Sequence, residues 1–201
     1  MYNRNKKLIR LTQLALLVAI TLLMAFTPLG YLRTPVLSVS FLTVPVAIGA
    51  MLLGPGAGGF LGLVFGLTSF ADAFTGGGMK AVLLTINPFA CFVTTVVSRV
   101  LCGWLCGLAY QLCHRLLEGK AAGYFLAGFV CPLANTVFFM SFLMLFYYGS
   151  NYIQGLTQTL GVTNPILLIL AMVGLQGAVE LVVCTALAGG VTHTLARYLR
   201  R

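Results

Sequence analysis

Residues 40–69 have the sequence SFLTVPVAIGAMLLGPGAGGFLGLVFGLTS, in which no side chain carries a charge. The tripeptide Gly54-Pro55-Gly56 divides this stretch into two apolar segments, at about 40–53 and 57–72. Glycine and proline together favour a turn, and long apolar segments are typical of helices that cross a membrane. The stretch therefore predicts two membrane helices joined by a tight turn. The first is short for a crossing unless it is tilted or sheltered by neighbouring helices.

The composition of the whole chain agrees with this prediction. Of its 201 residues, 60% are hydrophobic and 7% are charged, whereas a soluble domain carries about 25% charged residues. The mean hydropathy is +1.01. These values exclude a soluble, a disordered and a fibrous protein. The length accommodates six or seven membrane helices and little else, so energy for any transport has to come from a gradient or from a partner.

Charged residues and helix breakers divide the remaining sequence into further spans. We predict an all-α integral membrane protein, with residues 1–201 forming a single six-helix domain. The transmembrane helices are expected at about 11–29, 40–53, 57–72, 91–113, 121–147 and 165–196. Residues 81–90, which contain Asn87-Pro88, are expected to form a re-entrant or capping segment. No cleavage site follows the first apolar segment, so it is expected to stay as a span rather than act as a signal peptide.

The distribution of basic residues predicts the orientation. Nine Lys and Arg lie at the two termini and between the fourth and fifth spans, whereas only Arg33 and Lys80 lie in loops on the opposite side. The positive-inside rule then places both termini in the cytoplasm, and the expected location is the cell membrane. The net charge of +9 does not indicate nucleic-acid binding, because the basic residues gather at helix ends rather than along a stripe.

Polar residues inside the predicted spans indicate a site in the outer part of the membrane. Arg99, Asn135 and Glu180 lie 15 to 17 residues from basic residues at their cytoplasmic helix ends, or about 23–26 Å along a helix. Asp72 falls at a similar depth, and Gln176 lies one turn from Glu180. Each ionisable group at such a depth costs about 2.5–3.5 kcal/mol. Two interpretations remain: a ligand cavity open to the extracellular side, which we favour, and a structural Arg99–Glu180 ion pair with Asn135 joining helices.

Other motifs indicate packing rather than chemistry. No zinc-protease or Walker A motif occurs, so neither catalytic residues nor ATP hydrolysis by this chain are expected. The six cysteines lie in apolar segments and do not have the paired spacings of a zinc site, so no metal is expected. The stripe Gly58, Gly62 and Gly66 is expected to let helices approach closely. Ala15 and Ala19 form a similar pair, either for internal packing or for docking another membrane protein.

Five segments carry a resemblance to a known family. They are the 40–69 stretch, residues 98–108 (SRVLCGWLCGL), residues 134–137 (ANTV), residues 177–181 (GAVEL) and the Ala15-x-x-x-Ala19 pair. The chain resembles the substrate-binding S components of energy-coupling factor (ECF) vitamin transporters, and within that family it is most similar to the pantothenate type. The likeness covers nearly the whole chain.

The resemblance implies a division of labour between subunits. The S component takes up a vitamin from outside, and a transmembrane coupling protein (the T component) with two ATPase subunits drives release inward. This chain would then need no cofactor, because its partners use the ATP. Ala15 and Ala19 would face the coupling protein. Arg99, Arg33 or Lys80 would meet the carboxylate of pantothenate, and its hydroxyl and amide groups would meet Asn135, Gln176, Asn87 and Glu180.

Three alternatives stay open at this stage. One is an S component for another vitamin, such as folate or riboflavin. Another is a self-sufficient carrier driven by a proton or sodium gradient, with Asp72 or Glu180 as the coupling site. The third is a membrane scaffold in which the polar layer is purely structural.

Overall fold

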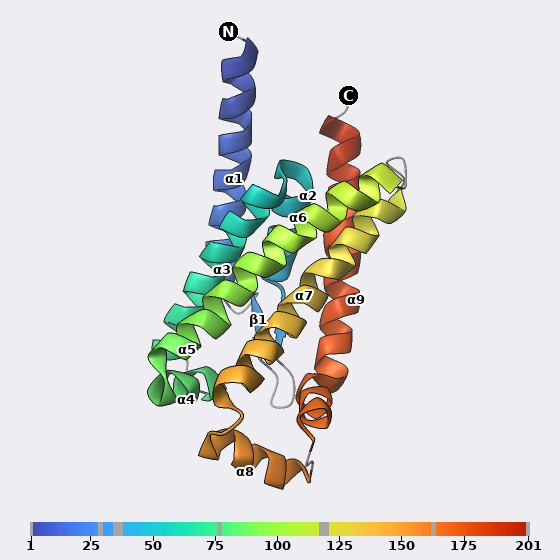
Figure 1. Cartoon of the computed structure of the whole chain (residues 1–201). Coiled ribbons are helices and arrows are strands. Elements are labelled where there is room, and N and C mark those ends of the chain that lie inside the picture. The colour runs from blue at the N-terminus through green and yellow to red at the C-terminus, as the bar shows by residue number, and fades with distance from the viewer. Residues whose placement is uncertain are drawn as a thin grey trace.

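The computed structural model describes residues 2–27, 30–33, 38–75, 78–116, 121–161 and 164–199. Long helices lie side by side in one bundle, with the N- and C-terminal ends of the chain at the same end and α8 across the opposite end (Figure 1). In chain order, the elements are α1 (Tyr2–Phe26), β1 (Tyr31–Arg33), β2 (Ser38–Ser40), α2 (Thr43–Leu53), α3 (Pro55–Thr75), α4 (Gly78–Ile86), α5 (Pro88–Phe92), the π-helical η1 (Val93–Val97), α6 (Ser98–Leu116), α7 (Ala121–Tyr147), α8 (Asn151–Leu160) and α9 (Pro165–Leu199).

The surface of the bundle is apolar, as expected for a protein in a lipid bilayer. Large apolar side chains are exposed along the long helices, among them Phe26, Leu145 and Val182. Within the described part of the chain, five helical segments are long and apolar enough to cross a membrane: Lys7–Phe26, Pro55–Thr75, Pro88–Leu116, Ala121–Tyr147 and Gly177–Tyr198. The protein is therefore a multi-pass membrane protein.

The remaining predicted span, at about 40–53, corresponds to α2, which lies in the centre of the bundle. α2 contacts α1, α3, α6, α7 and α9, and most of its side chains are buried. Its 11 residues reach about 16 Å, well short of the roughly 30 Å hydrocarbon core. Gly54 ends the helix with φ +96°, a conformation that favours glycine, and Pro55 begins α3. The 40–53 segment is thus a short, sheltered helix, and a six-span topology stays a prediction.

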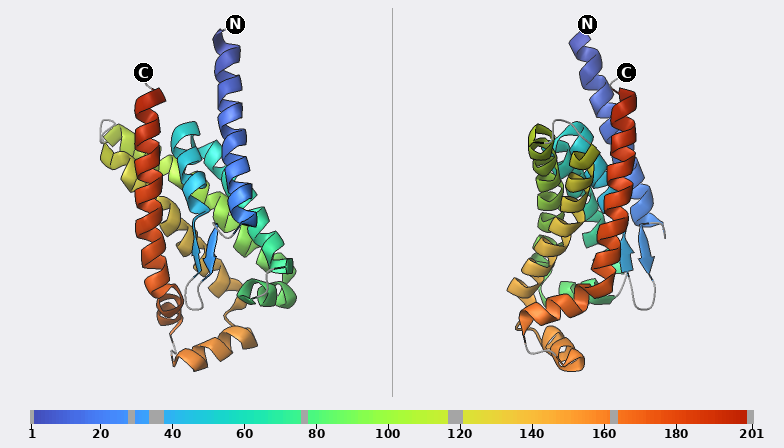
Figure 2. Two further views of the ribbon diagram at one scale, coloured as in Figure 1. Left: turned by 180° about the vertical axis from the view of Figure 1, so that it is seen from behind. Right: turned by 90° about the vertical axis from the view of Figure 1, so that its right-hand side faces the viewer.

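A small β-hairpin departs from the predicted all-α fold. The sequence predicts only a loop after the first span, but β1 and β2 pair antiparallel, with Tyr31 opposite Ser40 and Arg33 opposite Ser38. The hairpin lies beside α9, which contacts β2 (Figure 2). Backbone N–H and C=O groups inside a membrane need hydrogen-bond partners. Strand pairing supplies those partners for residues 31–33 and 38–40.

Several boundaries also differ from the predictions, although α7 has the predicted limits. The fourth span begins at Pro88 rather than at about 91, because Asn87 caps α5 through a hydrogen bond from the Ala90 N–H to Oδ1 (3.1 Å). The predicted re-entrant or capping segment is largely α4. The sequence did not predict α8, which ends at Gly161 with φ +65°. A kink at Gly174, with φ +32°, interrupts α9.

The predicted glycine stripe brings α3 against α6 and η1. A Cβ added at Gly58 would overlap the backbone of Gly103, and one at Gly62 would overlap the carbonyl of Arg99. A Cβ at Gly66 would overlap the backbone of Val96. This confirms the prediction that these glycines permit close helix packing. The close approach also sets the side chains of α3 beside the start of α6, where the polar residues lie.

Candidate functional site

Arg99 is the buried cation among the described residues, with 6% of its surface exposed. Its Nη1 donates hydrogen bonds to the Thr94 carbonyl (3.0 Å) and to Ser98 Oγ (2.9 Å). The guanidinium carbon lies 4.6 Å from the ring centroid of Phe139 in α7 and 5.4 Å from that of Phe65 in α3. Arg99 is thus held by cation–π contacts with two helices and by hydrogen bonds to its own helix.

The π-helical turn before α6 helps to hold this side chain. π-Helical turns inside α-helices are frequent at functional sites. Here the carbonyl of Thr94 accepts the hydrogen bond from Arg99 and a second one from Ser98 Oγ (2.6 Å). Thr94 Oγ1 is buried and, within the described part of the chain, has no hydrogen-bond partner.

Two further polar side chains lie one helical turn from the aromatic rings that contact Arg99. Asn135 precedes Phe139 by four residues on α7 and is 8% exposed, and Ser69 follows Phe65 by four residues on α3 and is fully buried. Residues four apart lie on the same face of a helix. Among the described residues, neither Asn135 Oδ1 nor Ser69 Oγ has a hydrogen-bond partner.

Glu180 contributes the polar group of α9. It is 8% exposed, and its Oε2 accepts a hydrogen bond from the Ser40 N–H of β2 at 3.5 Å. Its other oxygen, Oε1, is buried with no hydrogen-bond partner in the described part of the structure. Glu180 and Arg99 are close enough to interact electrostatically. The hairpin and α9 therefore face the helices that hold Arg99 across the interior of the bundle.

These groups together can bind a polar ligand. Most buried polar atoms in proteins have hydrogen-bond partners, and leaving one unsatisfied costs about 1–3 kcal/mol. Asn135 Oδ1 and Glu180 Oε1 are acceptors, whereas the hydroxyls of Ser69 and Thr94 both donate and accept. We call this set, with Arg99, the polar cluster. Its unsatisfied acceptors favour a ligand site over a purely structural ion pair, while a cavity open to the outside stays a prediction.

Other predicted site residues are placed differently. Asn87 is exposed and its side chain caps α5, so it is committed to local structure. Asp72 forms an ion pair with Lys80 of α4 at 3.1 Å and does not belong to the buried set. The side chains of Gln176 and Arg33 lie outside what the structure describes, so the structure does not test the roles predicted for them.

The structure also adds residues that the sequence analysis missed. Phe65 and Phe139 contact the guanidinium. The Thr94 carbonyl and Ser98 Oγ accept its hydrogen bonds, and Ser69 is a buried hydroxyl one turn from Phe65. The signal for Ser98 was its position next to Arg99 in the 98–108 segment. Nothing in the sequence distinguishes Phe65 and Phe139 from the other phenylalanines.

The predicted partner-facing residues lie on the outside of the bundle. Ala15 and Ala19 are both exposed on α1, whereas Leu17 faces inward toward Gly49 of α2. Only 6% of the α1 span is buried. Internal packing of the alanine pair, one of the two interpretations of the sequence, is therefore not what the structure shows.

The cysteine side chains pack between helices. Cys102 Sγ of α6 lies 3.4 Å from Cys131 Sγ of α7, and Cys106 Sγ donates to the Ala127 carbonyl at 3.3 Å. In the part of the chain that the structure describes, no three His, Cys, Asp or Glu side chains form a group that could hold a metal ion.

Comparisons with known proteins identify the family of the chain. Residues 9–191 match the sequence profile of the family described as ECF transporter, substrate-specific component. The chain is 29% identical over 168 residues to the pantothenic acid transporter PanT of Lactococcus lactis subsp. cremoris, covering 79% of this chain and 78% of the relative. It is 32% identical over 146 residues to the pantothenate transporter PanT of Leuconostoc mesenteroides subsp. mesenteroides, covering 67% and 66%.

Both relatives are transporters rather than enzymes. The profile match covers three of the five membrane-spanning segments in full, most of the first and of the last, and every residue of the polar cluster. The chain therefore belongs to the family of substrate-specific components of ECF transporters.

Proposed function

We propose that this protein captures pantothenate at the outer face of the bacterial cell membrane, as the substrate-specific subunit of an ATP-driven importer. The observation that carries the proposal is the polar cluster around Arg99, a cation held between Phe65 and Phe139 in the interior of an apolar bundle. The names of the two relatives support the choice of vitamin.

The chemistry of pantothenate fits the polar cluster. The molecule has a carboxylate, an amide, two hydroxyls and a branched apolar centre. Arg99 supplies the cation for the carboxylate, since guanidinium and carboxylate form strong, directional pairs. Asn135 Oδ1 and Glu180 Oε1 supply acceptors for N–H and O–H groups, and the hydroxyls of Ser69 and Thr94 supply further partners. The phenylalanine rings supply apolar contact for the branched carbon.

The aromatic vitamins fit this interior less well. Folate and riboflavin carry flat ring systems that need stacking surface. The rings of Phe65 and Phe139 already lie against the Arg99 guanidinium. Trp104 is 47% exposed on α6 rather than buried in the bundle. These contacts favour a small flexible acid over a vitamin with fused rings.

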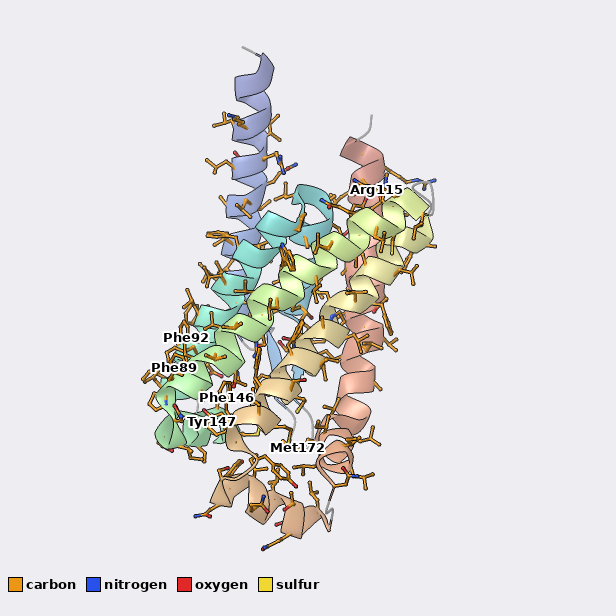
Figure 3. All side chains as sticks on the ribbon, viewed as in Figure 1. Phe89, Phe92, Arg115, Phe146, Tyr147 and Met172 are labelled. Atoms are coloured by element: carbon orange, nitrogen blue, oxygen red, sulfur yellow. The ribbon has the colours of Figure 1, made fainter. Side chains whose placement is uncertain are left out.

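The proposed direction of capture rests on charge and depth. Arg115 lies at the same end of the bundle as the two chain termini, whereas Tyr147 and Met172 lie at the opposite end (Figure 3). By the positive-inside rule, the basic end faces the cytoplasm. Arg99 lies 16 residues before Arg115, or about 24 Å along the helix, so the polar cluster would be closer to the outer face.

The proposed energy source is a partner module, made of a T component and two ATPase subunits. The exposed pair Ala15 and Ala19 on α1 gives a flat, small-residue face of the kind that lets another helix approach closely. A gradient-driven carrier is the second candidate. Its proposed coupling residue Asp72 is engaged with Lys80, which leaves Glu180 as the acid of the polar cluster for that role.

The deciding experiment uses the solitary purified protein. Mass spectrometry of the denatured protein identifies any small molecule that co-purifies, and calorimetry then measures Kd for pantothenate, folate and riboflavin. We expect pantothenate to co-purify and to bind much more tightly than the other two. Tighter binding of another vitamin would overturn the ligand assignment. A well-folded protein that binds none of the three would overturn the capture function.

Uptake in cells separates the two energy sources. We expect pantothenate uptake to require co-expression of the T component and ATPases, and to stop when the ATPase active sites are inactivated. Uptake by this chain alone, abolished by a protonophore or by removal of sodium, would instead establish the gradient-driven carrier.

A further inference from the structure

A second polar region lies far from the polar cluster, at the basic end of the bundle. There, α1, the turn between α2 and α3, and α6 enclose a cleft of about 600 Å³. This volume lies within the range of about 300–1,000 Å³ for small-molecule sites. Its lining includes Lys7 and Arg10 of α1, residues 54–57 of the turn and the start of α3, and Gln111 of α6. We call this space the basic cleft.

The cleft is positively charged and none of its lining residues is acidic. Arg10 is fixed over the turn, because its Nη2 donates a hydrogen bond to the Leu53 carbonyl at 2.6 Å. This bond ties α1 to the end of α2. Gly56 has open space beside it, so the backbone at the start of α3 is accessible to a ligand held by the two cations.

The cleft also has an apolar wall. Leu11 and Leu14, which follow the two cations along α1, line it together with Leu53. Cations followed along the helix by leucines match a molecule that has an anionic head and hydrocarbon chains. Basic pockets between membrane helices on the cytoplasmic side bind anionic lipid headgroups.

We propose that the basic cleft binds the headgroup phosphate of an anionic phospholipid such as phosphatidylglycerol, with Lys7 and Arg10 as its cationic ligands. The leucines would contact the upper part of the acyl chains. The bound lipid would then lie between α1 and the α2–α3 turn, next to the helix that carries Ala15 and Ala19. This site is separate from pantothenate binding and does not depend on it.

The test is native mass spectrometry of the full-length protein in detergent, titrated with dioctanoyl phosphatidylglycerol. Dioctanoyl phosphatidylcholine and inorganic phosphate are the comparison ligands. We expect one phosphatidylglycerol molecule to bind in preference to both comparison ligands. Arg10→Gln and Lys7→Gln should each raise the Kd for phosphatidylglycerol about fivefold, because each basic residue contributes about 1 kcal/mol. Arg197→Gln is the matched control, because Arg197 is exposed in the last turn of α9 and does not line the cleft.

Each other outcome would overturn the proposal. Equal weakening by Arg197→Gln would show a general charge effect rather than a site. Equal binding of phosphatidylcholine would show that the headgroup charge is not recognised, and equal binding of inorganic phosphate would assign the cleft to a soluble anion. Pantothenate binding by the Lys7 and Arg10 variants is expected to stay unchanged, which checks that they fold.

Discussion

The contact between Arg99 and the carboxylate of pantothenate can be tested by changing the protein and the ligand together. The protein change is Arg99→Ala, which removes the guanidinium from between Phe65 and Phe139. The ligand change replaces the carboxylate of pantothenate with a hydroxymethyl group, as in its alcohol analogue. If the two groups form a pair, removing either one should abolish the same interaction, and removing both should cost little more.

The structure sets the expected magnitude. A hydrogen-bonded pair that involves a charged group contributes about 1.5–3 kcal/mol, which corresponds to about 10- to 150-fold in Kd. Arg99→Ala should therefore raise the Kd for pantothenate by that factor, and the Kd for the alcohol analogue by about threefold or less. The substitution should not leave the Thr94 carbonyl unpaired, because Ser98 Oγ still donates to it at 2.6 Å. Arg99→Lys keeps the charge but loses the planar fork of donors, so an intermediate loss is expected.

Isothermal titration of the purified variants with both ligands measures the four Kd values, and a thermal melt of each variant checks the fold. If Arg99→Ala raised the Kd for pantothenate and the Kd for its alcohol analogue by the same factor, the proposed ion pair would be refuted. In that case Arg99 would only organise the interior, as the structural interpretation of the sequence holds.

Three further predictions concern other parts of the molecule. Asn135→Ala should raise the Kd for pantothenate about tenfold, because it removes a buried hydrogen-bonding group. An unchanged Kd in calorimetry would show that Asn135 does not belong to the site. Ala19→Trp should leave pantothenate binding intact but abolish uptake in cells that contain the partner module. The control Ala186→Trp, at an exposed position on α9, should leave both binding and uptake intact. Loss of pantothenate binding in Ala19→Trp would contradict the docking role. Gly62→Ala should lower stability by about 1–3 kcal/mol because its Cβ would overlap backbone of α6. Gly190→Ala has open space and should leave the melting temperature unchanged or raise it, so equal melting temperatures for these two variants would refute the packing argument.

The long helices were predictable because a lipid environment restricts the chain to a few solutions. Segments that cross the bilayer have to be long, apolar and helical, so breakers and charges mark their ends directly. The helix α7 keeps the limits predicted for it, 121–147. Arg99, Asn135 and Glu180, the polar residues predicted from their distance to the basic helix ends, are all buried in the bundle. Their place in a ligand site stays a prediction.

The features that were missed depend on neighbours in space. The β-hairpin forms because two short segments can pair with each other beside α9, and no local pattern in three-residue strands indicates this. Asn87 was expected at the ligand, but Asn followed by Pro is also a helix start, and the side chain caps α5. Asp72 was predicted at the same depth, but Lys80 on the following helix pairs with it. Counting residues along a helix predicts the depth of a polar residue but not the direction in which its side chain points.

The composition of the polar cluster bears on specificity as well as on affinity. A site that buries polar atoms rejects a ligand that lacks the matching group, because that atom then stays unsatisfied in a water-poor interior. Asn135 Oδ1 and Glu180 Oε1 come from different helices, and both are buried acceptors without a partner among the described residues. If the polar cluster is the ligand site, a ligand would have to bring donors to both, as well as a negative group to Arg99. An apolar acid of similar size would satisfy the cation alone, so the acceptors, rather than the charge, would select pantothenate from other small carboxylates.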